Sequence, residues 1–346
     1  MTIPTLPIID VSPYLDDNSS KESRRIVAEQ LHVACRDVGF FYLKVDGYVD
    51  RSESEELMEL QRRFFQRPKE EKEDLAISKQ DNARGYQKVG QNVTLSQNDH
   101  HEALDFYRPV ENPDATKPIW GENQWPSNPP EYREKMEAWV RKMKHLGMMV
   151  MKAMSDGLKM TEEEWKGLEK SMDDSFWCMR CIGYPSLPGD KGHKGISCGE
   201  HRDYGCLTLL FTDPTPSALQ VLYRDPNGPD HAAADASLKG YWIDANPIPG
   251  AAVVNIGDMV EIWTNGLYKS TLHRVIHRGD NYRVSVPFFF EPNWDTKVEP
   301  LAAAKRIQEQ MKEGENGKEA AKHYEPIVYG DHLKRKVGGN FAKYDQ

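Results

Sequence analysis

The chain has 346 residues and a formal net charge of −9, and it contains no long basic stretch, which argues against a nucleic-acid partner. Its 38% hydrophobic and 29% charged residues are typical of a folded protein. No segment approaches the roughly 18 apolar residues of a membrane span. Five cysteines, an odd number, argue against a secreted disulfide framework. We therefore expect a cytoplasmic protein that acts on a small molecule and has no obligate protein partner.

The first half of the chain carries mostly helical signals. Apolar residues spaced three or four apart predict helices over residues 21–35 and 54–65, and the aromatic run at 39–45 predicts a strand between them. The segment 84–109 has little periodicity, so we expect a loop that borders a site. The longest helix is expected over 130–157, where a methionine stripe indicates core packing.

From residue 176 the hydrophobic period changes from 3.6 to 2. Seven short apolar segments within 176–291, separated by Gly, Pro, Asn and Asp clusters, predict an antiparallel sandwich or jelly roll. The segment 224–240 is long for a hairpin and is expected to be a surface insertion. Residues 302–322 are expected to form a helix broken at glycines, which could fold over the mouth of a barrel.

The stretch GEHRDYGCLTLLF, residues 199–211, holds two candidate metal ligands. On a strand, His201 and Asp203 would point to the same side and supply one nitrogen and one anionic oxygen. His273 is the candidate third ligand, because it lies on a later strand of the same β unit. Two histidines and one carboxylate leave open positions on an octahedral Fe(II), whereas Zn(II) usually has a closed tetrahedral shell or holds one water.

Ten positions after His273, Arg283 and Ser285 share one face of a predicted strand. A guanidinium and a hydroxyl converging beside a metal could grip a carboxylate bidentately. A surface ion pair is the ordinary alternative for such an arginine, and the three nearby metal candidates favour the binding role.

Ordered motifs run along nearly the whole chain. They are LPIIDVSPYL (6–15), GFFYLKV (39–45), RRFFQRPKEEKEDL (62–75), HRD (201–203), NIGD (255–258), WTNGLYKSTLHRV (263–275) and RVSVPFFFEPN (283–293). Together they resemble the Fe(II)/2-oxoglutarate-dependent dioxygenases of the isopenicillin N synthase-like family. The resemblance implies a mainly β fold with a helical N-terminal region and a double-stranded β-helix (jelly-roll) core flanked by helices.

The resemblance also implies a reaction and its site. Such an enzyme uses Fe(II), 2-oxoglutarate and O2 to oxidise a small-molecule substrate, most often by hydroxylation, and releases succinate and CO2. By position, iron would be held by His201, Asp203 and His273, and the C5 carboxylate of 2-oxoglutarate by Arg283, Ser285 and Tyr184.

One motif departs from the plant pattern. Where plant members commonly read N-Y-Y-P, this chain has IGYP at 182–185, and MRCIGYP is more similar to a microbial branch of the family. In that branch Arg180 would point into the pocket, although an arginine bonded across the barrel is an open alternative. The candidate substrate contacts are Arg180, Arg84, Tyr86, Arg202 and Tyr107, with further contacts expected from residues 324–341.

We expect one compact unit with four regions. These are an N-terminal region over 1–120, a helical support over 121–175, the catalytic β-helix core over 176–295, and a C-terminal helical lid or tail over 296–346.

Three other functions remain open at this point. An Fe(II) oxidase of the same fold, such as isopenicillin N synthase or aminocyclopropane-carboxylate oxidase, would consume no 2-oxoglutarate. A non-catalytic jelly-roll metal-binding protein would take up no O2. A metal-dependent hydrolase would bind zinc without a redox response.

Overall fold

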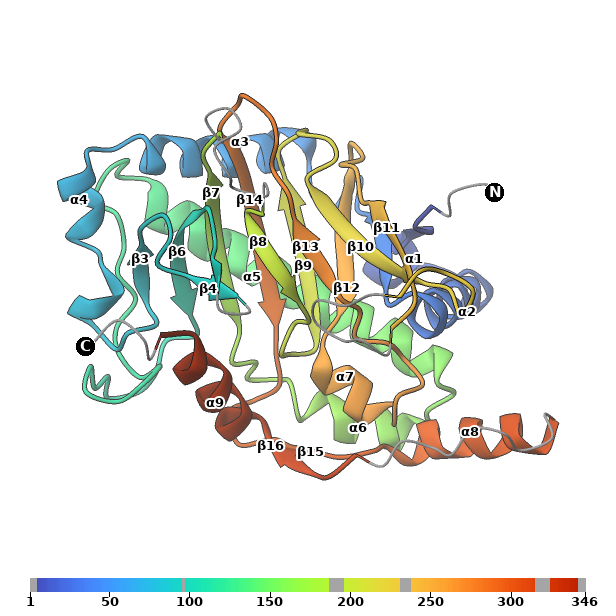
Figure 1. Ribbon diagram of the computed structural model, residues 1–346. Helices are drawn as coiled ribbons and strands as arrows, with labels where there is room; N and C mark the ends of the chain where they lie inside the picture. Colours follow the sequence, from blue (N-terminus) through green and yellow to red (C-terminus); the bar gives the residue numbers. More distant parts are fainter. Residues whose placement is uncertain (1–4, 95–96, 187–195, 231–237, 315–323, 342–346) are drawn as a thin grey trace.

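Two β-sheets form the centre of the protein, which we describe from a computed structural model (Figure 1). The structure describes residues 5–94, 97–186, 196–230, 238–314 and 324–341. The larger sheet consists, in order, of β1 (Ile8–Asp10), β2 (Phe40–Lys44), β12 (Ala251–Ile256), β9 (Leu207–Thr212), β14 (Arg283–Phe290), β7 (Cys178–Tyr184), β6 (Glu102–Tyr107) and β3 (Gly85–Gln87). The smaller sheet consists of β11 (Gly240–Asp244), β10 (Leu219–Arg224), β13 (His273–Val275) and β8 (Cys198–His201).

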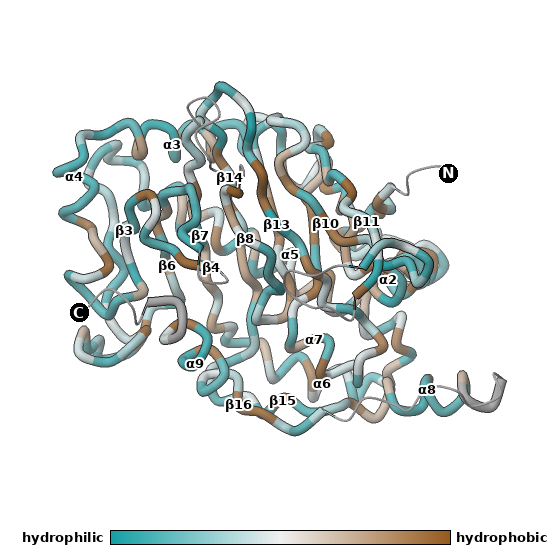
Figure 2. The backbone as a smooth tube through the Cα atoms, viewed as in Figure 1, coloured by the Kyte–Doolittle hydropathy of each residue, from teal (hydrophilic) through white to brown (hydrophobic). Residues whose placement is uncertain are grey.

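The strand pairings are those of a jelly roll. The pair β1–β2 is parallel, and the pairings among β2, β12, β9, β14, β7, β6 and β3 are antiparallel, as are those of the smaller sheet. The seven strands expected within 176–291 are all present, which confirms the predicted fold class. Figure 2 shows hydrophobic residues along the strands of both sheets, whereas α3 and α4 at the periphery are largely hydrophilic.

Long helices cover the outer face of the larger sheet. These are α2 (Lys21–Asp37), α3 (Arg51–Phe65) and α5 (Tyr132–Gly157), and α5 passes behind the sheet in Figure 1. The close approach of α5 requires Gly147, since a Cβ there would lie 2.6 Å from the ring of Phe290. The α5 methionines Met136, Met143, Met151 and Met154 are buried, which confirms the expectation of core packing.

Shorter elements complete the described part of the chain. They are α1 (Ser12–Leu15), α4 (Lys69–Glu73), a 3-10 helix (Ile77–Lys79), β4 (Val93–Thr94), β5 (Gln97–Asn98), α6 (Glu162–Glu169), α7 (Asp258–Trp263), β15 (Lys297–Val298), α8 (Ala302–Gly314), β16 (Ile327–Val328) and α9 (Tyr329–Phe341). None of the helices in this part of the chain combines the length and the apolar character needed to cross a membrane.

The helices and the strand expected in the first half are confirmed, with ends shifted by up to three residues. The predicted helix over 302–322 is present as α8 up to residue 314, and residues 315–323 lie outside the described residues. Within the expected insertion at 224–240, residues 231–237 also lie outside the described residues. Strands from the first 120 residues share the larger sheet with strands of the expected core region, so the sheet does not mark a boundary between the two. The division of the chain into four regions therefore stays a prediction.

The expectation of a loop over 84–109 was wrong. The segment contains β3, β4, β5 and β6, and β6 is buried along its whole length between β3 and β7. This strand contains polar residues that interrupt its hydrophobic pattern, and these residues form hydrogen bonds with other buried side chains. Gln87 of β3, for example, donates a 2.6 Å hydrogen bond to Asp105 of β6. A strand buried on both faces shows no alternation, which explains the missed signal.

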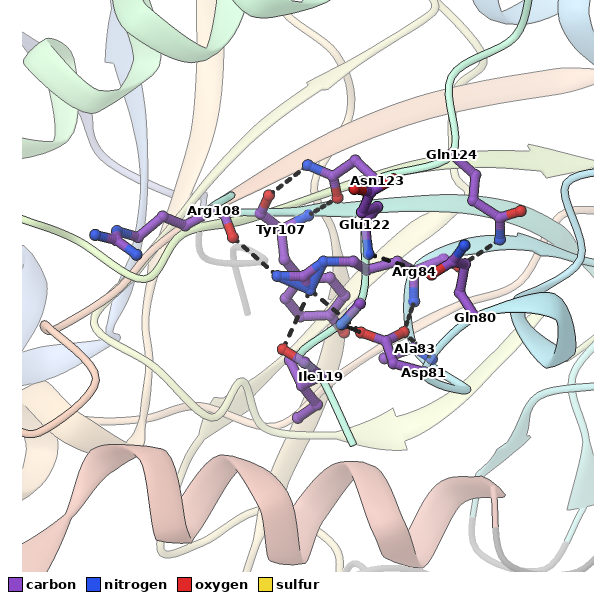
Figure 3. Close-up of polar contacts among 11 residues, drawn as sticks. Gln80, Asp81, Ala83, Arg84, Tyr107, Arg108, Ile119, Glu122, Asn123 and Gln124 are labelled. Carbon is purple, nitrogen blue, oxygen red and sulfur yellow. Dashed lines mark hydrogen bonds and ion pairs between the residues drawn. The ribbon is translucent and has the colours of Figure 1, made fainter. Parts of the chain in front are cut away.

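Arg84, just before β3, is the centre of a buried polar cluster (Figure 3). Its guanidinium donates to the carbonyl oxygens of Arg108 (2.8 Å) and Ile119 (3.2 Å) and lies 3.4 Å from the Asp81 carboxylate. It also lies 5.2 Å from the ring centre of Tyr107. Burial lowers the pKa of Arg84, and the Asp81 carboxylate opposes that shift. Arg84 therefore ties together three segments that are distant in the sequence.

We predict that Arg84→Met lowers the free energy of unfolding by about 3–5 kcal/mol, because it leaves Asp81 as a buried charge without its partner. Urea unfolding would measure the change. Arg25→Met is the matched control, since Arg25 forms an exposed pair with Glu22 that should contribute no more than about 1 kcal/mol. Equal stability of the two variants would contradict the role given to Arg84.

Candidate metal centre

Three side chains converge at the end of the smaller sheet. His273 opens β13 and lies opposite His201, the last residue of β8. The Asp203 Oδ1 atom lies 3.7 Å from Nε2 of His201 and 3.7 Å from Nε2 of His273. One ligand atom from each residue can be chosen so that all three lie within 4.8 Å of one another. Two imidazoles and one carboxylate at this spacing suit a metal ion that keeps open positions.

His201 and Asp203 do not share the face of one strand, so that expectation was wrong. β8 ends at His201, and Asp203 lies in the turn that follows. A backbone hydrogen bond stabilises this turn: the N–H of Asp258 donates to the carbonyl oxygen of Asp203 at 2.9 Å. In the side chain, Oδ2 accepts hydrogen bonds from the Thr208 hydroxyl and, at 2.6 Å, from the Asn255 amide. Oδ1 is thereby left to face the histidines.

Backbone carbonyl groups fix the tautomers of both histidines. Nδ1 of His201 donates to the carbonyl oxygen of Gly199 at 2.8 Å, and Nδ1 of His273 donates to that of Thr271 at 3.1 Å. Because a carbonyl oxygen only accepts, the neutral ring must carry its proton on Nδ1 and its lone pair on Nε2. Metal-binding histidines are commonly oriented by such a bond from the other ring nitrogen.

The charge states of the three side chains can be compared with what a metal requires. Burial opposes ionisation of Asp203, but the two imidazoles and two hydrogen bonds hold its pKa below the usual value. Burial and the neighbouring His201 lower the pKa of His273 to about 4. Burial also disfavours protonated His201, yet Cys198 and Asp203 raise its pKa to about 10. A metal ion bound here would therefore displace a proton from His201.

A cavity of about 560 Å³ is lined by these three side chains and by residues of both sheets. Along its wall, Arg283 of β14 pairs in register with Tyr184 of β7, and the guanidinium carbon lies 4.8 Å from the tyrosine ring centre. Ser285, on the same face of β14, also lines the cavity. Arg283 is only 2% exposed, yet Nε and Nη1 lack a hydrogen-bond partner among the described residues. Such a guanidinium fits the carboxylate of a bound small molecule.

Three of the five candidate substrate contacts line the cavity: Arg180, Arg202 and Tyr107. Arg84 and Tyr86 do not. Arg84 packs behind Tyr107, in the cluster of Figure 3. The side chain of Tyr86 lies on the face of β3 opposite to that of Gln87, because successive side chains of a strand alternate. Its hydroxyl donates a 2.6 Å hydrogen bond to the buried carboxylate of Glu102.

Arg180 both faces the cavity and is bonded to the protein. Its Nη2 donates to Asn92 at 2.8 Å and to Gln87 at 3.3 Å, and Nη2 lies 3.4 Å from Nε2 of His101. Its Nε lies 3.5 Å from the Asp105 carboxylate, the partner of Arg180 in the β6–β7 register. Arg180 can therefore face the cavity, as one alternative expected, and also be bonded to other protein groups, as the other expected.

Sequence reasoning did not identify several residues of the site. Asn255 could have been found, since it belongs to the NIGD motif, but Thr208 lies in an ordinary apolar strand and carries no signal. Glu291 ends the FFFE run that follows Arg283 and Ser285. Helix α9, within the segment expected to carry specificity, contributes Tyr329, Leu333, Lys336 and Val337 to the cavity.

Comparisons with known proteins agree with this geometry. Residues 6–128 match the family model described as the non-haem dioxygenase N-terminal domain in morphine synthesis, and residues 176–292 match that of the 2OG-Fe(II) oxygenase superfamily. Among similar curated proteins, homoarginine-6-hydroxylase 2-ODD-C23 of Glycine max is 41% identical and 2-ODD-C23.1 of Arabidopsis thaliana is 40% identical. Each alignment covers 98% of this chain and 98% of the relative.

Among solved structures, that of a full-length Neurospora crassa protein in complex with alpha-KG superimposes with a TM-score of 0.76 at 26% identity, covering 96% of both chains. Two imidazoles, one carboxylate and a buried arginine with unsatisfied donors line one cavity of this chain, so its own residues fit an iron ion and a 2-oxo acid. The chain therefore belongs to the 2OG-Fe(II) oxygenase superfamily and is a dioxygenase that uses Fe(II), 2-oxoglutarate and O2 to oxidise a small molecule.

Proposed function

We propose that the substrate is a free amino acid with a guanidino side chain, and that homoarginine is the first compound to test. The observation that carries this proposal is the set of relatives named homoarginine-6-hydroxylase. Three of them, from two dicots and from Oryza sativa, are 38–41% identical and align over 97–98% of this chain and 98% of their own length. A substrate site is more readily retained when identity extends over the whole chain than when it is confined to the metal ligands.

The charges in the cavity support an amino-acid substrate. Such a molecule carries an ammonium, a carboxylate and a guanidinium, so its site needs groups of both signs. The cavity offers the cationic side chains of Arg180, Arg202 and Lys336 and the acidic side chains of Asp105 and Glu291. We propose that Arg180, Arg202 and Tyr107 contact the substrate.

We further propose the roles of the remaining site residues. His201, Asp203 and His273 hold the iron, while Arg283, Ser285 and Tyr184 hold the distal carboxylate of 2-oxoglutarate. When bound, the iron supplies with 2-oxoglutarate and O2 the oxidising power for hydroxylation. The protein orients both small molecules, and its apolar wall around Leu210, Val275 and Phe289 keeps water from the reacting atoms.

Four finer assignments remain part of the proposal. Membership of the isopenicillin N synthase-like group rests on the ordered motifs, and the microbial branch rests on MRCIGYP. A cytoplasmic location and independence from a protein partner rest on composition.

We predict that wild-type protein releases succinate in stoichiometry with a hydroxylated homoarginine, or with breakdown products of that compound. Mass spectrometry and a succinate assay would measure the two products. L-Arginine and thymine, the latter a ligand of the same Neurospora crassa protein, serve as comparison substrates. Succinate release that homoarginine fails to stimulate, while thymine stimulates it, would contradict the proposed substrate. Oxidation of homoarginine without any loss of 2-oxoglutarate would instead indicate the oxidase alternative.

We predict that Asp203→Ala weakens Co(II) binding by at least about 100-fold, since even the loss of a residue that merely supports a ligand typically costs about 10- to 100-fold. Calorimetric titration of apo-protein with Co(II) would measure the change without turnover. Asp17→Ala, at an exposed position, should bind Co(II) as wild type does. Unchanged Co(II) affinity of Asp203→Ala would rule out Asp203 as a ligand.

We predict that Arg283→Ala raises the KM for 2-oxoglutarate by about 10- to 100-fold, the usual effect of losing a hydrogen bond to a charged group. Co(II) affinity should stay unchanged, because Arg283 does not contact the metal ligands. Arg278→Ala, at an exposed position near the start of the same strand, is the control. A normal KM for 2-oxoglutarate in Arg283→Ala would mean that another group holds the distal carboxylate.

A further inference from the structure

Glu291 differs from most of the other acidic residues of the cavity. It is 4% exposed, it lines the cavity, and it has no cationic side chain within 4.0 Å among the described residues. Three other cavity carboxylates outside the metal centre lie near a cationic side chain of the protein: Asp105 lies 3.5 Å from Arg180, Glu200 3.1 Å from Arg274 and Asp258 3.8 Å from Lys336. Asp99 resembles Glu291, since it accepts only from a backbone N–H, that of Gly199 (2.9 Å), and from a hydroxyl, that of Thr94 (2.7 Å).

The carboxyl group of Glu291 lies against the turn that carries Asp203. Its Oε2 accepts a 3.2 Å hydrogen bond from the N–H of Cys206, and a Cβ on Gly205 would lie 1.4 Å from that oxygen. The register of β14 against β9 also places Glu291 near Asp203. Thr208, which hydrogen-bonds Asp203, pairs with Phe289, two residues before Glu291 on the chain. Glu291 thus lies next to the metal-binding turn, whereas Arg283 lies at the opposite end of β14.

Burial disfavours the ionised form of Glu291 unless a cation lies beside it. Burial raises the pKa of Glu291 well above its usual range, and the nearby Tyr329 hydroxyl only partly opposes this shift through a hydrogen bond. A buried carboxylate is costly unless it is paired. A guanidinium is the cation best matched to it, because its planar fork is weakly hydrated and bonds a carboxylate with two parallel hydrogen bonds.

We infer that Glu291 binds the guanidinium of the substrate beside the metal-binding turn. This inference rests on the proposed function, which supplies the guanidino amino acid. It also orients that molecule in the cavity. The guanidinium end lies toward the metal, so oxidation falls on the chain carbon next to the guanidino group, and the α-carboxylate points away from the metal-binding turn, toward Arg180.

The test compares homoarginine with homocitrulline, a neutral compound of the same shape in which a urea replaces the guanidinium. Protein loaded anaerobically with Fe(II) and 2-oxoglutarate is titrated with each compound, and the visible absorption of the iron complex reports binding. Wild type should bind homoarginine more tightly, by about 10- to 100-fold, as expected for a hydrogen bond to a charged group. Glu291→Gln, which keeps the shape of the side chain, should lose this preference while homocitrulline affinity stays within about threefold.

A control variant and three possible results complete the test. The matched control is Glu299→Gln, because Glu299 is half exposed and pairs with Lys297 outside the cavity; this variant should behave as wild type. Equal affinity of wild type for both compounds would overturn the inference without any variant. A full homoarginine preference in Glu291→Gln, with its iron absorption intact, would overturn it as well. Failure of wild type to bind homoarginine at all would instead overturn the proposed function, and the inference with it.

Discussion

The two oxygens of the Asp203 carboxylate have separate partners, and the geometry of the candidate metal centre depends on that separation. Oδ2 is occupied by Thr208 and Asn255, which come from two adjacent strands of the larger sheet. Oδ1 faces the histidines, which belong to the smaller sheet. The carboxylate therefore bridges the two layers of the jelly roll. Its charge is stabilised before any ion arrives, because hydrogen bonds and neighbouring imidazoles offset the cost of burial.

Strand β14 arranges the rest of the cavity along one line. Its alternate residues Arg283, Ser285, Pro287 and Phe289 line the cavity, and Glu291 continues the same face just beyond the strand. This order places polar groups at both ends and an apolar stretch between them. The polar groups can fix the ends of two small molecules, while the apolar stretch excludes water where they meet. The alternation of side chains along one strand thus provides both the groups that bind the small molecules and the apolar surface that excludes water.

The sequence was most informative where a regular period or a short ordered motif carried the signal. Alternation predicted the core strands, and the chemistry of His201, Asp203 and His273 predicted that they would converge. Arg84 could not be placed, because its partners Arg108 and Ile119 are distant in the sequence and are backbone carbonyl groups that any residue supplies. For the same reason β6 was missed, since its polar residues are satisfied by partners from other segments rather than by solvent.

The pairing of His273 with His201 across β13 and β8 also bears on how the protein forms. A slip of one residue between these strands would turn one imidazole to the opposite face, because side chains alternate along a strand. The candidate ligands therefore come together only after the strands have reached their final register. Ion binding in this protein would act as a check on completed folding, and misregistered chains would be left without an ion to stabilise them.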